Sequence, residues 1–319
     1  MKNKRWYKLD NAAKIFPPTT EQYDPKTFRF AVALKEEIDE KLLLEALKET
    51  LKDYPIFHST LKKGFFWYYL EESESKPLVA KEEKIPCDFV RGILYRVTYF
   101  KNRINLEVSH ALTDGTGTLA FLKSLVANYL KIKYKLKDIL VMDTASTTEK
   151  SDDSFEKYYK KARIHKKKIE KKAYKVKGID YPENRIKIIE GLMSTQKVHA
   201  LSKKYNTTMS IFLTSLLIDS IGKQMTMREK KRPVYITVPV NLRNYYPSKT
   251  IRNFFNTISI SYKFKDDFTF EDIIKSVEKQ FKENLTKQAL DDKMSDMVML
   301  ENIFFLRVIP RAIKDFVLK

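Results

Sequence analysis

Hydrophobic and polar positions in the N-terminal part of the chain change their period several times, and each period predicts an element. Residues 28–34 are dominated by aromatic and apolar side chains, which is typical of a strand. In residues 39–54, leucines and alanines recur about every 3.6 positions behind Asp39, so we expect an amphipathic helix that Asp39 caps. The remaining elements predicted here are two hairpins and a helix, over residues 56–70, 93–108 and 118–134.

The rest of the chain returns to this mixture after a change of composition. Residues 143–154 are rich in Ser, Thr, Asp and Lys and poor in apolar side chains, so we expect a linker. The dense basic block 157–177 follows and is predicted to be a solvated helix. Further helices and strands are predicted over residues 185–189, 194–205, 209–225, 234–240, 255–264, 268–284 and 303–317.

This order of elements favours an α/β fold, in the form of an α+β two-layer sandwich. We expect an N-terminal lobe (1–142), a linker with a basic helix (143–184) and a C-terminal lobe (185–319). A chain of 319 residues is long enough for two such lobes.

Composition narrows the class of protein. Apolar residues make up 43% of the chain and aromatic residues 13%, which supports a sizeable core and excludes disorder over most of the sequence. The one cysteine, Cys87, excludes an internal disulfide and a multi-cysteine zinc site, and we expect no metal. The most apolar stretch, 209–222, is too short to span a membrane and contains Asp219. We therefore expect a cytoplasmic protein without a transmembrane segment.

The net charge of +20 raises the question of an anionic partner. Most of the positive excess is lysine spread over the whole chain, a pattern that fits a biased composition as well as it fits a binding protein. Block 157–177 lacks the aromatic residues of single-strand binders and any recognised DNA-binding motif. We expect no specific nucleic-acid partner, and keep as an alternative a non-catalytic basic module that binds nucleic acid or an anionic membrane through this block.

Candidate chemistry concentrates in residues 106–117. A strand delivers His110 at its end, a short loop holds Asp114, Gly115 and Gly117, and a helix begins just afterwards. The ordinary pKa of histidine lets His110 accept a proton at neutral pH, so it is a candidate general base. The glycines would allow positive φ or a close approach to a ligand. The alternative for an isolated histidine is a hydrogen-bonded core residue, but the pattern H-x-x-x-D-G would arise by chance in roughly one such chain in 200.

These residues, 110–115, resemble the HxxxDG motif of the chloramphenicol-acetyltransferase-like superfamily. That superfamily includes condensation domains of peptide synthetases, BAHD acyltransferases, polyketide-associated acyltransferases and alcohol acetyltransferases. Residues 51–58, 238–243 and 253–257 resemble further segments of its members in the same order. Together with the opening segment 7–16, they make alcohol acetyltransferases and stand-alone condensation-domain proteins the closest match.

The resemblance implies two chloramphenicol-acetyltransferase-like lobes, the second of them incomplete because members of the superfamily are usually longer. On this view the chain is truncated at its C-terminus. Ser109 stands where condensation domains often carry a second histidine, as it does in many acyltransferase branches.

The implied activity is transfer of an acyl group, acetyl in the first instance, from a coenzyme A thioester to an alcohol or amine. His110, Asp114 and Gly115 would form the catalytic motif, with acyl-CoA as co-substrate and no permanently bound cofactor. Asp114 would fix the loop through an arginine, with Arg243 as the candidate and Arg96 as the alternative. The residues expected on the substrate side are Arg243, Asn253, Asn256 and Thr257, although the last three could simply cap a strand.

A second reading is a condensation-type domain that acts on substrates bound to an acyl-carrier protein. It predicts binding to acidic carrier proteins and no turnover with free acyl-CoA. Neither the acceptor nor the acyl chain length follows from the sequence.

Overall fold

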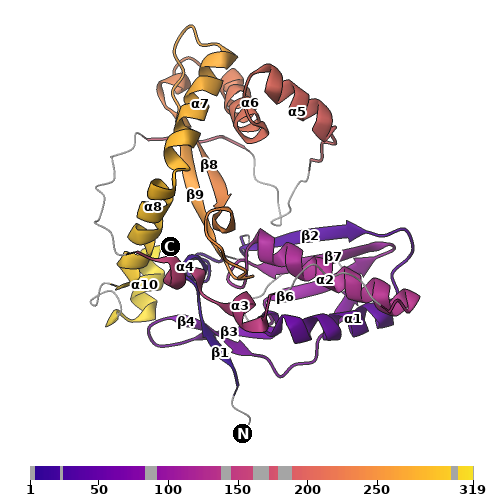
Figure 1. Ribbon diagram of the computed structural model, residues 1–319. Helices are drawn as coiled ribbons and strands as arrows, with labels where there is room; N and C mark the ends of the chain where they lie inside the picture. Colours follow the sequence, from indigo (N-terminus) through magenta and orange to yellow (C-terminus); the bar gives the residue numbers. More distant parts are fainter. Residues whose placement is uncertain are drawn as a thin grey trace. The chain divides into compact units, whose positions relative to one another are not determined.

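The computed structural model describes residues 4–21, 24–82, 92–137, 145–160, 172–178, 189–302 and 308–318, so Cys87 lies outside the described residues. The chain forms two compact units (Figure 1). Unit 1 contains Met1–Lys161, Asn241–Phe255 and Met297–Lys319, and unit 2 contains Ala162–Val240 and Asn256–Asp296. The units are therefore discontinuous in sequence, which differs from the consecutive lobes that we expected.

Unit 1 is built on a four-stranded sheet in the order β2-β7-β6-β5. Its strands β2 and β6 are antiparallel to β7, and β5 is parallel to β6. Helices α1 and α2 lie side by side against this sheet (Figure 1). The bounds are β2 Thr27–Ala33, α1 Glu40–Asp53, β5 Val79–Lys81, β6 Tyr95–Phe100, β7 Arg103–Ser109 and α2 Gly115–Tyr134.

Strand β7 is an inner strand of this sheet, between β2 and β6, and is buried along almost its whole length. Its apolar residues Ile104, Leu106 and Val108 alternate with polar ones and belong to the core that α1 and α2 cover. On the other face, buried Glu107 accepts from both Arg29 and Arg96. Since Arg96 is engaged by Glu107, the alternative partner proposed for Asp114 is ruled out.

Unit 1 also contains a small antiparallel sheet, with β4 between β1 and β3. Its bounds are β1 Trp6–Lys8, β3 Ser59–Lys63 and β4 Tyr68–Glu72, with short 3-10 helices at Ala12–Ile15, Pro55–His58 and Leu242–Asn244. Helix α10 (Arg311–Leu318) is fixed to this sheet because Arg311 donates to the Tyr68 hydroxyl at 3.1 Å.

The predicted linker is in part a packed piece of unit 1. Residues 145–160 form α3 (Thr147–Ser151) and α4 (Ser154–Tyr158). Phe155 is 1% exposed and stacks edge-on against Phe254, so this part of the linker prediction is wrong: a few apolar residues suffice to anchor it. The predicted basic helix is absent from 172–178, and the rest of its central part lies outside the described residues.

Unit 2 consists of a two-stranded sheet, β8-β9, and helices with polar N-caps. Its elements are α5 Thr195–Lys204, α6 Met209–Gln224, the 3-10 helix Glu229–Lys231, β8 Val234–Asn241, β9 Phe255–Tyr262, α7 Phe270–Asn284 and α8 Lys287–Asn302, whose last residues belong to unit 1. Helix α6 packs on α7, and Ile218, Ile258 and Ile273 are fully buried. Ser194, Thr208 and Thr269 cap three of the helices, as residues of this type do.

The mixed α/β class predicted from the sequence is confirmed. Helix α8 was not predicted, although its buried residues Leu290, Met294 and Val298 recur every four positions along one face. Within the described part of the chain, no helix is long and apolar enough to cross a membrane.

Candidate active site

His110 follows the last residue of β7, and its backbone is held from two sides. The His110 amide donates to the carbonyl of Lys26 at 2.8 Å. The His110 carbonyl accepts from Nδ2 of Asn253 at 3.0 Å. The sheet and the segment Asn241–Phe255 therefore fix the position of this residue together.

Aromatic rings surround the imidazole of His110, which remains partly exposed. Phe16 stacks on it at 4.5 Å between ring centroids, and Phe28 and Phe255 lie at 4.7 and 5.8 Å. Burial among these rings lowers the pKa of His110, although Asn253, Asp114 and the Thr113 backbone oppose the shift. The imidazole is therefore neutral at pH 7.

Asn253 and the Thr113 backbone both hydrogen-bond the ring of His110, and Asn253 indicates which ring nitrogen carries the proton. Nδ2 of Asn253 faces two acceptors, Oδ2 of Asp10 at 3.2 Å and the carbonyl of His110. The amide oxygen must therefore face Nδ1 of His110, at 3.3 Å. In the flipped amide the oxygen would face both acceptors, and neither of them would receive a hydrogen bond. Nδ1 then donates, and Nε2 is the nitrogen that can accept a proton.

Asp114 ties the loop after His110 to the segment Asn241–Phe255. Its Oδ1 caps α2 by accepting from the amide of Gly117 at 3.0 Å. Its Oδ2 accepts from the amide of Phe254 at 2.9 Å and from Nη1 of Arg243 at 2.8 Å. The ion pair expected between Asp114 and Arg243 is therefore present, with both side chains at most 10% exposed.

Every guanidinium nitrogen of Arg243 has a protein acceptor. Nε donates to the carbonyl of Thr250 at 2.9 Å, and Nη2 donates to the carbonyl of Arg252 at 2.6 Å. We expected Arg243 on the substrate side as well as beside Asp114. Its contacts are those of a residue that holds this loop in shape.

The glycines of the motif act differently from the expectation. Neither has positive φ. A Cβ at Gly115 would meet only the Phe30 ring, at an ordinary 3.7 Å, so the packing around this position does not require a glycine. A Cβ at Gly117 would instead overlap the carbonyl of Ile251. The close approach that glycine allows is thus between α2 and the segment Asn241–Phe255.

The other predicted substrate-side residues lie in unit 2. Asn256 is buried and accepts from the amide of Thr257 through its own Oδ1, whereas Thr257 is exposed. Of the remaining histidines, His58 bonds the Tyr95 hydroxyl and the Ser75 carbonyl, which suits a structural role. His199 lies on the exposed surface of α5, and His165 lies outside the described residues.

Neither the contact of Asp10 with Asn253 nor that of Phe16 with His110 was predicted from the sequence. Asp10 and Phe16 both belong to the opening segment 7–16, which was singled out only because it resembles a segment of the superfamily, and no role was assigned to its residues. Their partners Asn253 and His110 are distant in sequence, so no local periodicity indicates the contacts. A charged residue beside alanines at a short helix is common on surfaces, yet Asp10 is 1% exposed.

A small cavity of about 270 Å³ adjoins the loop that carries His110. Ser109 and Ala111, its two neighbours in the chain, line this cavity with Pro17 and Pro18. His110 itself is not among the lining residues. The space therefore lies next to the candidate base without including its ring.

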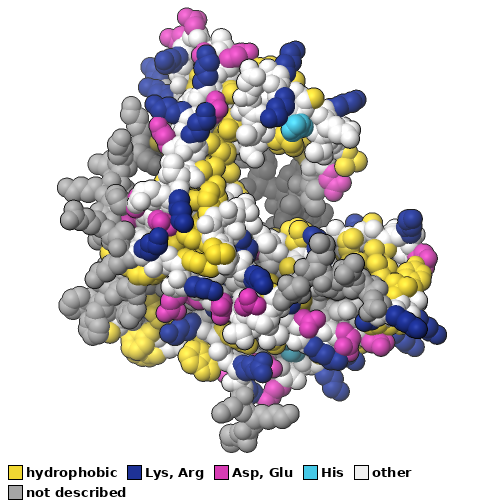
Figure 2. Space-filling view, viewed as in Figure 1, with side chains coloured by type: hydrophobic (Ala, Val, Ile, Leu, Met, Phe, Trp, Pro, Cys, Tyr) yellow, Lys and Arg dark blue, Asp and Glu magenta, His cyan; other side chains and the backbone are white. Residues whose placement is uncertain are grey.

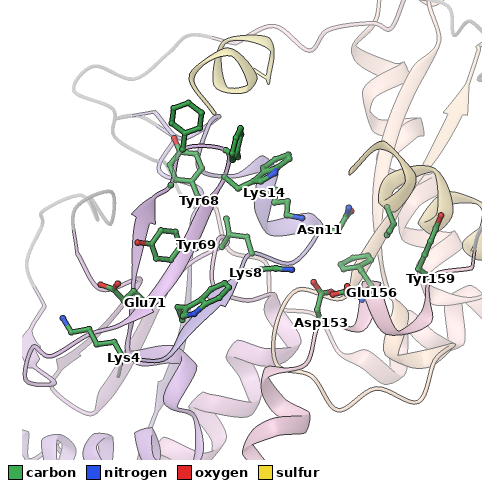
Figure 3. Close-up of a pocket in the computed structure, with 18 residues that line it drawn as sticks. Lys4, Lys8, Asn11, Lys14, Tyr68, Tyr69, Glu71, Asp153, Glu156 and Tyr159 are labelled. Atoms are coloured by element: carbon green, nitrogen blue, oxygen red, sulfur yellow. Dashed lines mark hydrogen bonds between the residues drawn. The ribbon is translucent and has the colours of Figure 1, made fainter. Parts of the chain in front are cut away.

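Unit 1 also has a wider groove, of about 910 Å³ (Figure 3). Lys4 and Glu71 lie at one end of it, and Asp153, Glu156 and Tyr159 at the other. Aromatic residues form much of its wall: Trp6, Phe65, Phe66, Trp67, Tyr68, Tyr69 and Phe155. None of the predicted site residues lines the groove, so we place the candidate centre at His110.

Comparison with known proteins identifies the fold. No protein-family model and no curated sequence matches the chain. Polyketide synthase associated protein 5 from Mycobacterium tuberculosis is 13% identical at a TM-score of 0.60, over 90% of this chain and 75% of its own. The first condensation domain of the calcium-dependent antibiotic synthetase, in complex with a substrate analogue, is 14% identical at 0.61, over 91% and 77%. The epimerization domain of tyrocidine synthetase B is 11% identical at 0.63, over 92% and 74%.

The chain therefore has the fold of these condensation and epimerization domains and of polyketide synthase associated protein 5. This fold family has acyltransferase members. The same fold also occurs in the X-domain, solved in complex with OxyB from teicoplanin biosynthesis.

Proposed function

We propose that the protein is an acyltransferase that moves an acyl group from a thioester to an alcohol or amine, with His110 as general base. The observation that supports this proposal is the protonation state of the His110 imidazole. Nδ1 of His110 is held by Oδ1 of Asn253, and the lowered pKa keeps the ring neutral. Nε2 is thus available as a base at physiological pH.

In this reaction the acceptor hydroxyl or amine attacks the thioester carbonyl carbon while Nε2 of His110 takes its proton. The tetrahedral intermediate collapses, the C–S bond breaks, and the imidazolium returns the proton to the leaving thiolate. No covalent intermediate with the enzyme is needed, because the acceptor attacks directly. Holding the two substrates in line would itself lower the barrier by about 7 kcal/mol, the lower end of the range for well-oriented reactions.

The neighbouring residues have supporting roles in this scheme. Asp114 and Arg243 hold the loop in shape, and Gly115 belongs to the motif without a contact that requires glycine. Asn253 positions the base. We assign Asn256 and Thr257 to the acceptor side, as the resemblance implies.

The donor is proposed to be acyl-CoA, with an acetyl group as the first candidate. Both coenzyme A and acyl-carrier proteins are anionic, so the net charge of +20 favours encounter with either. Figure 2 shows Lys and Arg side chains spread over the visible face among acidic ones, which suits long-range attraction more than a single docking patch. A reducing compartment, the cytoplasm, is consistent with the one cysteine.

A condensation-type reaction on carrier-bound substrates is the second candidate. The likeness to a condensation domain with a bound substrate analogue favours it. The two candidates share the chemistry at His110 and differ in the donor.

The test is release of free thiol from acetyl-CoA and from an acylated carrier protein, each with a panel of alcohols and amines. We expect His110→Ala to lower kcat/KM by about 10²- to 10⁴-fold, the usual contribution of a general base. His199→Ala, on the exposed surface of α5, is the matched control and should leave the rate unchanged.

Turnover with acetyl-CoA supports the first candidate, and turnover with the carrier alone supports the second. An unchanged rate in His110→Ala would overturn both. Absence of turnover together with strongly salt-dependent binding to nucleic acid or anionic vesicles, unaffected by His110→Ala, would instead support the non-catalytic basic module.

A further inference from the structure

Asp10 is a buried carboxylate that the proposed reaction does not use, and it touches the residue that holds the base. We propose that Asp10 is a positioning residue: it orients the Asn253 amide and thereby keeps His110 in the Nδ1–H form. This inference rests on the proposed function for its effect on rate. Its effect on the imidazole can be measured without any turnover.

Three N–H groups converge on the Asp10 carboxylate. Oδ1 accepts from the amide of Ala13 at 2.8 Å. Oδ2 accepts from the amide of Asn253 at 3.3 Å and from its Nδ2 at 3.2 Å. Both oxygens therefore act as acceptors, which an ionised carboxylate satisfies and an amide does not.

The contacts form a chain from Asp10 through Asn253 to the ring of His110. The Asn253 side chain has a donor end and an acceptor end, so fixing one end fixes the other. Asp10 and the His110 carbonyl hold the donor end, and Oδ1 is left facing Nδ1 at 3.3 Å. This series of contacts is analogous to the Asp–His pair of a catalytic triad, in which an acid orients the histidine, except that the Asn253 amide lies between the acid and the ring.

The charged groups around Asp10 are consistent with an ionised carboxylate that orients Asn253. Nε of Arg252 lies 3.7 Å from Oδ2, close enough to attract the charge but not to make a hydrogen bond. Asp153 is the other charged group that acts on it. Burial raises the pKa of Asp10 to about 6, with Arg252 opposing this shift and Asp153 adding to it. Asp10 is thus ionised at pH 7 in spite of its burial.

The test is the tautomer of His110, read from its imidazole ¹⁵N chemical shifts at pH 8, in the full chain. We expect the wild type to be in the Nδ1–H form. Asp10→Asn leaves one acceptor oxygen where Ala13 on one side and Asn253 on the other both need an acceptor, so the hold on the Asn253 amide weakens and a fraction of the Nε2–H form should appear. Asn253→Ala should do the same without disturbing the two backbone donors at Asp10, which keeps the test available if Asp10→Asn does not fold.

A double variant, Asp10→Asn with Asn253→Asp, provides the rescue. The new carboxylate can accept from Nδ1 of His110 and from the new side-chain amide at position 10, so the Nδ1–H form should return, although the His110 carbonyl loses the donor that Nδ2 of Asn253 supplied. Asp153→Asn is the matched control. It makes the same chemical change beside Asp10, asparagine can still cap α4, and the tautomer should stay as in the wild type.

In the acyl-transfer assay, with the acyl donor and the acceptor substrate that the wild type uses, Asp10→Asn and Asn253→Ala should lower kcat by about 10- to 100-fold. KM should stay nearly unchanged, as it does on loss of an orienting partner. A His110 tautomer that is the same in wild type and in folded Asp10→Asn overturns the proposal, whatever the activity and whatever Asn253→Ala shows. A shifted tautomer in a protein that transfers no acyl group overturns the proposed function instead and leaves the positioning role established.

Discussion

Removal of both charges of the Asp114–Arg243 pair should destabilise unit 1 by clearly less than the sum of the two single removals. The two side chains are 7% and 10% exposed and meet at 2.8 Å. Asp114→Asn leaves a buried guanidinium without its counter-charge, and Arg243→Met leaves a buried carboxylate. Breaking a buried pair in this way costs about 3–5 kcal/mol for each single variant.

The double variant separates the pair from the other contacts of Arg243. Loss of the bonds to the carbonyls of Thr250 and Arg252 occurs both in Arg243→Met and in the double variant, so it cancels in the cycle. No uncompensated charge remains once both partners are gone. We therefore expect the double variant to be less destabilised than the sum of the single variants by about 2–3 kcal/mol.

Urea unfolding followed by tryptophan fluorescence is the appropriate assay. The two tryptophans, Trp6 and Trp67, both belong to unit 1, so the signal reports the unit that contains the ion pair. The exposed pair of Glu49 and Lys52 on α1 gives a control cycle, for which we expect a coupling of about 0.5 kcal/mol or less. A coupling between Asp114 and Arg243 no larger than this control would refute the reasoning.

Two further stability predictions concern the same region, with the same assay. Gly117→Ala should destabilise unit 1 by about 1–3 kcal/mol through steric overlap, whereas Gly115→Ala should change stability by no more than about 0.5 kcal/mol; equal effects would contradict the packing described. The pKa of Asp10 is about 6 in the folded protein and 3.8 in the unfolded chain, so ionisation of Asp10 opposes folding. The free energy of unfolding, measured relative to that of Asp10→Asn, is therefore greatest below pH 3.8 and falls by about 3 kcal/mol as pH rises through 6. Asp153→Asn removes a charge that raises this pKa and should shift the fall to lower pH, while a pH-independent difference would show that the carboxylate is not desolvated.

Local signals in the sequence predicted most elements of unit 1 and the position of the candidate base. Asp39 caps α1 as its place before an apolar periodicity indicates, with Oδ1 accepting from the amide of Leu42 at 3.0 Å. The strand, loop and helix around His110 were also predictable, because each is encoded within a few residues.

Contacts between distant segments were beyond this kind of reasoning. The ion pair of Asp114 and Arg243 was expected only through the resemblance, since the two residues are 129 positions apart. Nothing in the local sequence indicates that Asp10 meets Asn253, 243 positions away. The division of the chain into consecutive lobes failed for a related reason: the anchors of Asn241–Phe255 are Asp114 and His110, which lie in the first part of the chain.

Several local costs to stability in unit 1 converge on His110. Lys26, whose carbonyl accepts the His110 amide, has φ of 52°, a conformation unfavourable for a residue with a side chain. Asp10 is ionised at pH 7 at the expense of folding, and Gly117 gives up helix propensity so that Ile251 can approach α2. Stability alone would favour glycine or asparagine at position 26 and an apolar residue at position 10. Lys26 holds the backbone of His110, Asp10 contacts Asn253 beside the His110 ring, and Gly117 follows the same loop. Locally unfavourable choices of this kind are expected to concentrate at functional sites.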